Sequence, residues 1–244
     1  MSEYVNNAEA NVSAAKGVVG GYAFRAPVGT TLPDSPDWTP DTSPSYDLTA
    51  DTDIVSGKTY YTRSGSGTSA SPYVYTPVAS PVKASIGTYY EKNAAAWTCM
   101  GYVTEDGETF ATSSNVVEFR DQNGDIMDTS QSQYGETFAC SFAETKAATF
   151  QSVFGEGAVT DEGGVLRVNH TGEEPGVFTY AFLFLLKDGR KWVRYADKCK
   201  RTSIGDLQTN SSNVLAWNAT YQVLRSENTG GYFVDLFEST ETEV

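Results

Sequence analysis

The residues that could support catalysis or bind a metal are few and scattered. The single histidine, His170, lies in a Val-Asn-His-Thr-Gly segment, and no Gly-x-Ser-x-Gly motif or phosphate-binding glycine loop accompanies it. The three cysteines lack the Cys-x-x-Cys spacing of a zinc site, and an odd, widely spaced set does not indicate a disulfide framework. Carboxylate pairs such as Glu173-Glu174 are adjacent in sequence, and adjacent strand residues point to opposite faces. The sequence therefore predicts no enzyme, no cofactor and no metal.

One segment superficially suggests a calcium-binding loop. Asp121, Asn123 and Asp125 have the spacing of the first three ligands of such a loop. However, Ile126 occupies the position of the sharp-turn glycine, and no glutamate follows at position twelve. Asn-Gly between two short apolar runs is instead the strongest short signal for a β-hairpin, which we predict over residues 116–128.

Charge excludes some functions and divides the sequence into two zones. The net charge is -14, so attraction to nucleic acid or to an anionic membrane is not expected. Acidic residues dominate positions 101–144, whereas basic residues dominate positions 187–201. Such runs are usually solvated faces, but they also fit a self-complementary protein whose acidic and basic surfaces meet head to tail. The N-terminus has no basic start followed by an apolar core, so no secretion signal is expected.

The element that the rest of the fold must cover is the strand pair at 176–196. Aromatic residues from Phe178 to Phe184 alternate with smaller or aliphatic ones, and Asp188-Gly189 provides a tight turn before a return strand. A capping box at 141–144 and helical spacing of apolar residues up to Phe154 predict one short helix, which we expect to pack against this hairpin.

The composition changes between about residues 36 and 96, where prolines and tyrosines concentrate. We interpret this stretch as an inserted module of three or four short strands. Its pairs Tyr60-Tyr61 and Tyr89-Tyr90 could form a sugar-binding platform, although paired aromatic residues more often form the core of a small sheet. The predicted organisation is an N-terminal arm and loop (1–35), the inserted module (36–96), a β-sandwich (97–237) and an acidic C-terminal tail (238–244).

Several segments, taken in order and spacing, resemble the major tail proteins, or tail tube proteins, of long-tailed bacteriophages with flexible tails. The resemblance covers nearly the whole chain except residues 36–96. It rests on the following segments: Gly17 to Asp34, Trp97 to Gly107, the Phe-Arg-Asp-x-x-Gly hairpin at Phe119 to Gly124, Thr137-Phe138, Glu144 opening a helix that closes on Phe154-Gly155, and the aromatic strand with its Asp-Gly turn at 178–190.

The resemblance implies a mainly β fold: a β-sandwich with one short flanking α-helix, which forms a shared inner β-barrel when six copies close a ring. Stacked rings then form the conduit for DNA in the virion tail, after synthesis in the bacterial cytoplasm. The implied partners are the chain itself, the tape measure protein, the tail terminator and the baseplate or tip proteins, with no specific DNA binding and no membrane anchor. The alternatives are a monomeric receptor- or carbohydrate-binding decoration module and, third, a tail terminator or neck protein.

Three sets of residues are candidate assembly sites. The expected acidic lining of the lumen comprises Glu118, Asp121, Asp125 and Asp128. The expected basic contacts between rings or subunits are Lys187, Arg190, Lys191, Arg194, Lys198, Lys200 and Arg201. The expected contacts of the N-terminal arm are Tyr22, Phe24 and Arg25.

Overall fold

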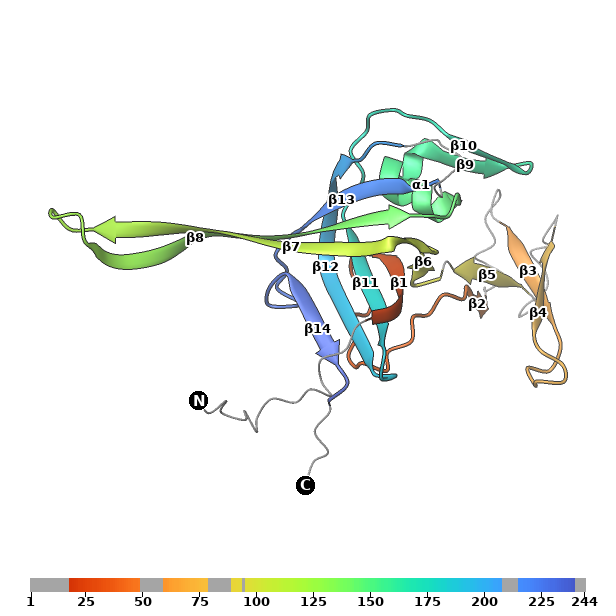
Figure 1. Ribbon diagram of the computed structural model, residues 1–244. Helices are drawn as coiled ribbons and strands as arrows, with labels where there is room; N and C mark the ends of the chain where they lie inside the picture. Colours follow the sequence, from red (N-terminus) through yellow and green to blue (C-terminus); the bar gives the residue numbers. More distant parts are fainter. Residues whose placement is uncertain (1–17, 49–58, 79–88, 94, 208–214, 240–244) are drawn as a thin grey trace, which may run out of the picture. The chain divides into compact units, whose positions relative to one another are not determined.

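The structure, a computed structural model, describes residues 18–48, 59–78, 89–93, 95–207 and 215–239 (Figure 1). The chain divides into a main unit, Met1–Pro40 with Trp97–Val244, and an inserted unit, Asp41–Ala96. Strands dominate both units, and the described residues contain a single α-helix, in the main unit. The prediction of a mainly β protein with one short helix is confirmed.

Most described strands of the main unit belong to one antiparallel sheet. Its order is β6-β1-β11-β12-β13-β8-β7, and β14 also pairs with β12. The strands are β1 (Val18–Pro27), β6 (Thr98–Cys99), β7 (Val103–Arg120), β8 (Ile126–Phe142), β11 (Phe178–Leu186), β12 (Lys191–Ile204), β13 (Trp217–Val223) and β14 (Phe233–Phe237). A separate two-stranded sheet joins β9 (Val159–Glu162) to β10 (Val165–Val168).

The long strand β12 connects two layers of this sheet. Its first half pairs with β11 on one side and β14 on the other, and its second half pairs with β13, which leads to β8 and β7. Aromatic rings fill the space between the layers: Phe138 of β8 stacks on its cross-strand partner Tyr221 of β13 at 4.6 Å and contacts Tyr180 of β11, in the other layer, at 5.2 Å. All three side chains are almost completely buried, so this cluster is the centre of the core.

The predicted hairpin at 176–196 is confirmed as β11 and β12. Gly189 adopts a φ of 89°, which L side chains rarely take, and the Leu186 N–H donates to the Arg190 carbonyl at 2.9 Å. The face of β11 that carries Tyr180, Phe182 and Phe184 is buried, because it points into the core. Its other face is covered less completely, and Leu185 is exposed.

The single described helix, α1 (Ala147–Phe154), starts later than the sequence indicated. The predicted capping box is wrong, because β8 continues to Phe142 and no side chain caps Lys146 at the N-cap position. Glu144 instead accepts a hydrogen bond from the Tyr102 N–H at 2.9 Å. Gly155, with a φ of 103°, ends the helix and is followed by a 3-10 turn, Glu156–Ala158.

The helix packs against the aromatic core, as predicted. The Ser152 hydroxyl lies 2.6 Å from the Tyr180 hydroxyl and 2.5 Å from the Tyr221 hydroxyl. Burial raises the pKa of both tyrosines, so both phenols stay protonated at neutral pH. This three-hydroxyl cluster ties α1 to both layers and satisfies polar groups that would otherwise be buried without partners.

The inserted unit contains a four-stranded sheet of order β2-β5-β3-β4 in its described residues. These strands are β2 (Ser45–Leu48), β3 (Tyr60–Ser64), β4 (Val74–Val78) and β5 (Tyr90–Asn93). The unit begins a few residues after the predicted start at residue 36, because Trp38 belongs to the main unit. There its ring packs edge to face against Trp97 at 5.0 Å and against Phe24 at 6.1 Å.

Candidate functional site

Strands β7 and β8 continue beyond the rest of the main unit as a long two-stranded arm, residues 111–135 (Figure 1). Pairing of β8 with β13 is confined to Glu136–Phe142, and β7 pairs with no described strand except β8. Apart from Asp121, every residue from 111 to 134 is exposed. The hairpin predicted at 116–128 is therefore correct in place and is only the tip of a much longer ribbon.

Backbone and side-chain hydrogen bonds hold the turn at the tip of the arm. The Asp121 carboxylate accepts from the backbone N–H groups of Asn123 at 2.9 Å and Asp125 at 2.8 Å. Gly124 has a φ of 90°, as the Asn-Gly signal predicts. The aspartate that suggested calcium binding thus caps its own turn.

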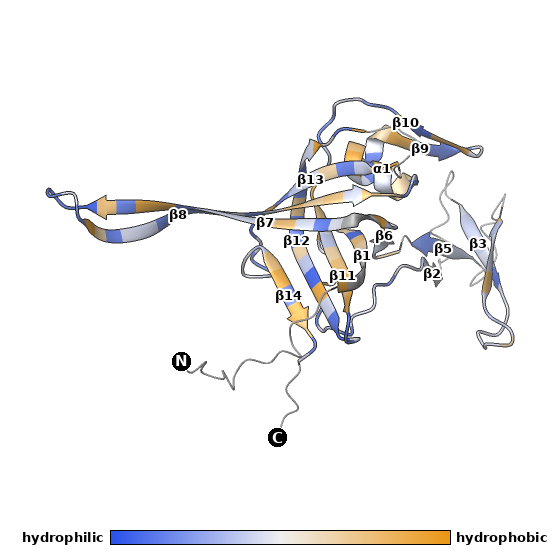
Figure 2. Ribbon diagram, in the orientation of Figure 1, coloured by the Kyte–Doolittle hydropathy of each residue, from blue (hydrophilic) through white to orange (hydrophobic). Residues whose placement is uncertain are grey.

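The arm carries apolar side chains that no described residue buries. Val116, Val117, Phe119, Ile126 and Met127 are 45–74% exposed. Val117 and Phe119 share one face of β7 and Val116 lies on the other, because successive strand residues alternate. Figure 2 shows hydrophobic residues near the tip of this ribbon. Both faces of the arm therefore present apolar surface, which is typical of a protein–protein contact.

The four carboxylates expected to line the lumen also lie on this arm. The hairpin brings together Glu118, Asp121, Asp125 and Asp128 near the tip. Glu118 forms an ion pair with Arg120, and Asp128 accepts a hydrogen bond from the Thr129 N–H at 2.8 Å. The expected clustering is present, and lumen lining remains a prediction.

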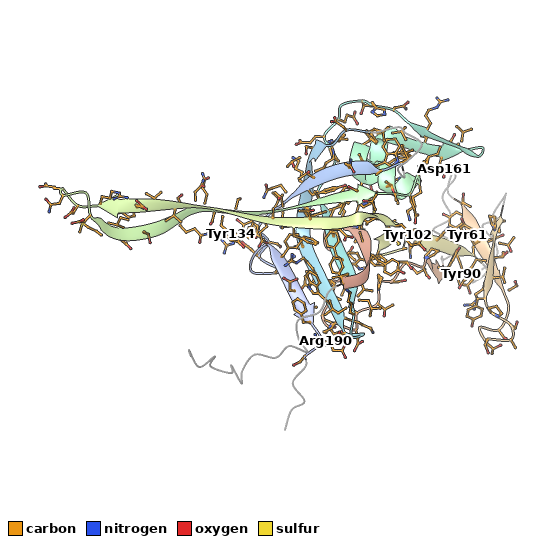
Figure 3. All side chains as sticks on the ribbon, in the orientation of Figure 1. Tyr61, Tyr90, Tyr102, Tyr134, Asp161 and Arg190 are labelled. Atoms are coloured by element: carbon orange, nitrogen blue, oxygen red, sulfur yellow. The ribbon has the colours of Figure 1, made fainter. Side chains whose placement is uncertain are left out.

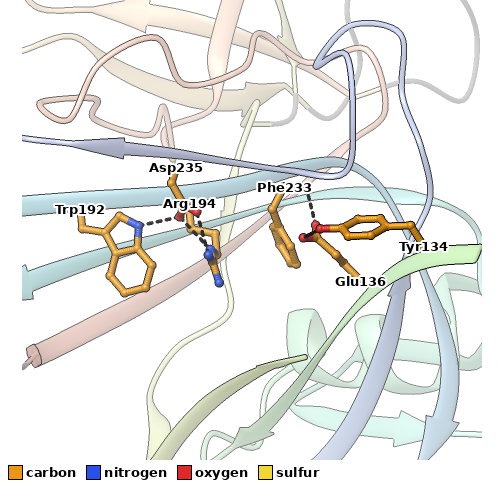
Figure 4. Close-up of polar contacts among 6 residues, drawn as sticks. All are labelled: Tyr134, Glu136, Trp192, Arg194, Phe233 and Asp235. Atoms are coloured by element: carbon orange, nitrogen blue, oxygen red, sulfur yellow. Dashed lines mark hydrogen bonds and ion pairs between the residues drawn. The ribbon is translucent and has the colours of Figure 1, made fainter. Parts of the chain in front are cut away.

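The root of the arm is fixed by contacts with the loop before β14 and with β14 itself (Figure 4). The Glu136 carboxylate accepts from the Tyr134 hydroxyl at 2.6 Å and from the Phe233 N–H at 3.0 Å. The first of these bonds raises the pKa of the Tyr134 phenol. The Tyr232 hydroxyl donates to the Tyr134 carbonyl at 3.0 Å. Sequence reasoning missed this network, because its partners are about a hundred residues apart.

A second contact at the root centres on Arg194 of β12. Its guanidinium forms two 2.7 Å bonds with the Asp235 carboxylate, which also accepts from the Trp192 indole N–H at 2.7 Å (Figure 4). The same guanidinium lies 4.6 Å from the centre of the Phe110 ring. Ion pair and ring contact together attach β12 and β14 to the base of β7.

We expect Asp235→Ala to destabilise the free subunit by about 2–3 kcal/mol, because it leaves a partly buried guanidinium without its counter-ion. Asp235→Asn should cost less, since its carbonyl oxygen still accepts from Trp192 and from one Arg194 nitrogen. Urea denaturation measures both values. The exposed Asp128→Ala variant is the control and should change stability by less than about 0.5 kcal/mol. Equal losses of unfolding free energy for Asp235→Ala and Asp128→Ala would contradict a stabilising role of the Arg194–Asp235 ion pair.

The basic residues expected to contact another subunit lie on β12 and on the turn before it. The intramolecular ion pairs are Arg190 with Asp188 at 2.8 Å, Lys191 with Asp37 at 2.6 Å, Arg194 with Asp235 at 2.7 Å and Lys200 with Glu174 at 2.8 Å. Lys187, Lys198 and Arg201 form no ion pair with a described residue. An inter-ring contact through this segment remains a prediction, for which these three cations lack an ion-pair partner among the described residues.

The residues expected to form an N-terminal arm contact lie on β1, a strand of the main sheet. β1 pairs with β11 along its length, and Phe24 and Arg25 are buried. The Arg25 guanidinium lies 4.4 Å from the centre of the Phe178 ring and donates to Gln151 of α1 at 3.3 Å. Among the three residues, only Tyr22 is exposed for contact with another subunit. Residues 1–17 of the expected arm and 240–244 of the acidic tail lie outside the described part of the chain.

The tyrosine pairs of the inserted unit do not form an open platform. Tyr60, Tyr89 and Tyr90 are buried. Tyr46 stacks on Tyr75 at 3.7 Å, so each ring covers one face of the other. Stacking on a sugar requires a free ring face, and the structure therefore gives no specific support to the carbohydrate-binding alternative.

Other kinds of site are not evident in the described residues. These residues contain no group of three or more His, Cys, Asp or Glu side chains placed to hold a metal ion. No helix among them is long and apolar enough to span a membrane. His170 is exposed and contacts the Phe154 ring at 4.4 Å.

The main unit is thus a two-layer β unit with a projecting ribbon that carries exposed apolar residues near its tip. The model of the phage tail tube protein family matches residues 68–234, which is more than half of the chain. The chain therefore belongs to the phage tail tube protein family and is a structural protein of the virion tail. The match begins within the inserted unit. No curated protein matches the chain.

Proposed function

We propose that copies of this chain close into rings of six, and that the rings stack into a tube through which phage DNA enters the host. The observation that carries this proposal is the arm. A two-stranded hairpin is marginally stable alone in water, and this one has no described strand on either outer edge. Such edges pair readily with another chain. We infer that arms from neighbouring subunits pair into the shared inner β-barrel.

Burial of the apolar residues of the arm supplies the driving force. Each large apolar side chain contributes about 1.5–3 kcal/mol when it leaves water. Val117, Phe119 and Met127 alone thus offer several kcal/mol per subunit contact. Rings of identical subunits repeat this contact, so a modest energy per arm suffices for a stable assembly.

We assign the lining of the channel to Glu118, Asp121, Asp125 and Asp128, because carboxylates repel phosphate and let DNA slide without binding. A tube also needs an initiator, a length determinant and a terminator, which fits the expected partners: tip or baseplate proteins, the tape measure and the tail terminator. We propose no enzymatic activity.

Electron microscopy of the concentrated protein, with light scattering on a sizing column, tests the assembly. We expect hollow rings or tubes with a central channel. A population of single rings that never stack would favour a terminator or neck role. A protein that stays monomeric, even with the tip complex present to initiate assembly, would overturn the proposal.

Replacing Asp121, Asp125 and Asp128 by lysine should slow DNA ejection at least several-fold while tubes still form, because the lining would then attract phosphate. The rate is measured as DNA release from purified virions, and the effect should shrink as salt rises. Lysine at the exposed polar position Thr109, outside the tip, is the control. Ejection at the wild-type rate would exclude these residues from the lining.

A further inference from the structure

A pocket of about 510 Å³ lies between β1 and the start of β7. Its walls include Gly20 and Gly21 of β1, Glu108 and Phe110 of β7, Phe184 of β11 and Trp192 of β12. A Cβ added at Gly20 would meet no atom within 4 Å, so the backbone of β1 borders open space. The volume is within the range of about 300–1,000 Å³ in which proteins bind ligands or side chains.

The pocket is flanked by two strand edges without a described partner. One edge of β1 pairs with β11 along its whole length. On the other edge β6 pairs only at Phe24 and Arg25, and the Ala23 carbonyl accepts from the Met100 N–H, so residues 18–22 have no described strand partner on that edge. The pairing of β7 with β8 is interrupted between Val103 and Glu108, which displaces this part of β7 from the regular ladder. The edges of β1 and β7 that lack a described partner both border the opening of the pocket.

Glu108 gives the pocket a preference for cationic groups. The carboxylate is half-buried, and its Oε1 atom is buried without a hydrogen-bond partner among the described residues. Burial raises the pKa of this carboxyl group. A carboxylate oxygen that is buried without a hydrogen-bond partner is costly, and a cation is the group that offsets the cost best. The rings of Phe110, Phe184 and Trp192 can hold the aliphatic stem of a basic side chain.

A suitable basic side chain projects at the far end of the same unit. Arg167 of β10 is exposed and forms no ion pair with a described residue. Val165, two residues earlier on the same face of β10, is 61% exposed. Strand β9, which carries Asp161 and pairs with β10, and the β11–β12 turn near Arg190 lie at opposite ends of the main unit (Figure 3). The pocket lies toward the turn, because Val18 pairs with Leu186.

We propose that the pocket beside Glu108 binds the Arg167 side chain of a second copy of the chain, with Val165 against its aromatic wall. Because donor and acceptor lie at opposite ends of one subunit, the contact is head to tail and can repeat from copy to copy. This inference rests on the proposed tube function, for which it names one contact between subunits.

A double-mutant cycle tests the pairing. Glu108→Gln and Arg167→Gln should each raise the concentration needed for assembly at least tenfold, and the double variant should be no worse than either single one. Glu108→Gln should also make the free subunit more stable at neutral pH, which separates assembly from folding. Additive effects, or wild-type assembly by Glu108→Gln, would overturn the proposal.

A cross-linking experiment remains decisive even if no tube forms. The background is Cys99→Ser with Cys140→Ala, because Cys140 lies directly opposite residue 108 across β7 and β8 and would compete for the disulfide. In it, Glu108→Cys subunits are mixed with Arg167→Cys subunits under mild oxidation. We expect a disulfide-linked heterodimer, and none when Lys187→Cys replaces Arg167→Cys. A heterodimer without tubes would support the contact between Glu108 and Arg167 and contradict tube assembly. Tubes without a heterodimer would support tube assembly and contradict this contact.

Discussion

Subunits that carry Val117→Lys and Phe119→Lys should remain folded monomers and should fail to form tubes at the concentrations at which we expect the wild-type chain to assemble. Both side chains are about half exposed on the arm, so their replacement removes no contact within the subunit core. Two large apolar groups lose about 3–6 kcal/mol of burial between subunits. The concentration needed for assembly should therefore rise at least a hundredfold. Light scattering against protein concentration measures it.

The matched control places the same two charges elsewhere on β7. Thr109 and Ser114 are exposed polar residues nearer the root of the arm. Their lysine variants should assemble within a few-fold of the wild-type concentration. If both double variants failed equally, added charge would explain the loss, and the apolar contact would be refuted.

The largest expected effect on folding comes from Phe138→Ala. This ring is 1% exposed and touches aromatic residues of β7, β11, β13 and β14. Its truncation leaves a cavity where the two layers meet and should cost about 3–5 kcal/mol. That is a large part of the 5–15 kcal/mol by which a domain is usually stable. Chemical denaturation of the free subunit gives the value.

Phe119→Ala is the control for this prediction, because it removes the same ring from an exposed position on the arm. We expect its unfolding free energy to stay within about 0.5 kcal/mol of the wild-type value. Under the proposed assembly, the two phenylalanines separate two roles: Phe138 stabilises the subunit, and Phe119 contacts a neighbouring subunit. A comparable loss of stability in both variants would mean that the arm packs within its own subunit.

Local sequence patterns predicted those strands, turns and helices that are specified by residues close to one another in the sequence. The alternation from Phe178 to Phe184 and the turn at Asp188-Gly189 are satisfied by neighbouring residues, so β11 and the first part of β12 were predicted where they occur. The second part of β12, up to Ile204, was not predicted as a continuation of the hairpin. The same holds for Asn123-Gly124 at the tip of the arm. Helix spacing located α1, but the capping box failed, because pairing with β13 keeps Ser141 and Phe142 in β8.

The full arm was not predictable, because its strands carry many serine, threonine and charged residues without a buried face. Such a ribbon has no apolar alternation to mark it, and only the register between β7 and β8 shows its length. Glu108 is one of many carboxylates in the acidic stretch 101–144, and only the approach of β1 encloses it beside an aromatic wall. Neither feature follows from composition or spacing.

The sequence by itself determined the mainly β class, the position of both hairpins, the acidic balance and the resemblance that the family match bears out. The tertiary structure decided which charges remain available for partners. Arg194 meets Asp235 and Lys191 meets Asp37 because the sheet and the packed loop bring residues 41 and 154 positions apart to within 2.7 Å. The attraction between two opposite charges weakens with their distance in space, and the number of residues between them in the sequence does not determine that distance.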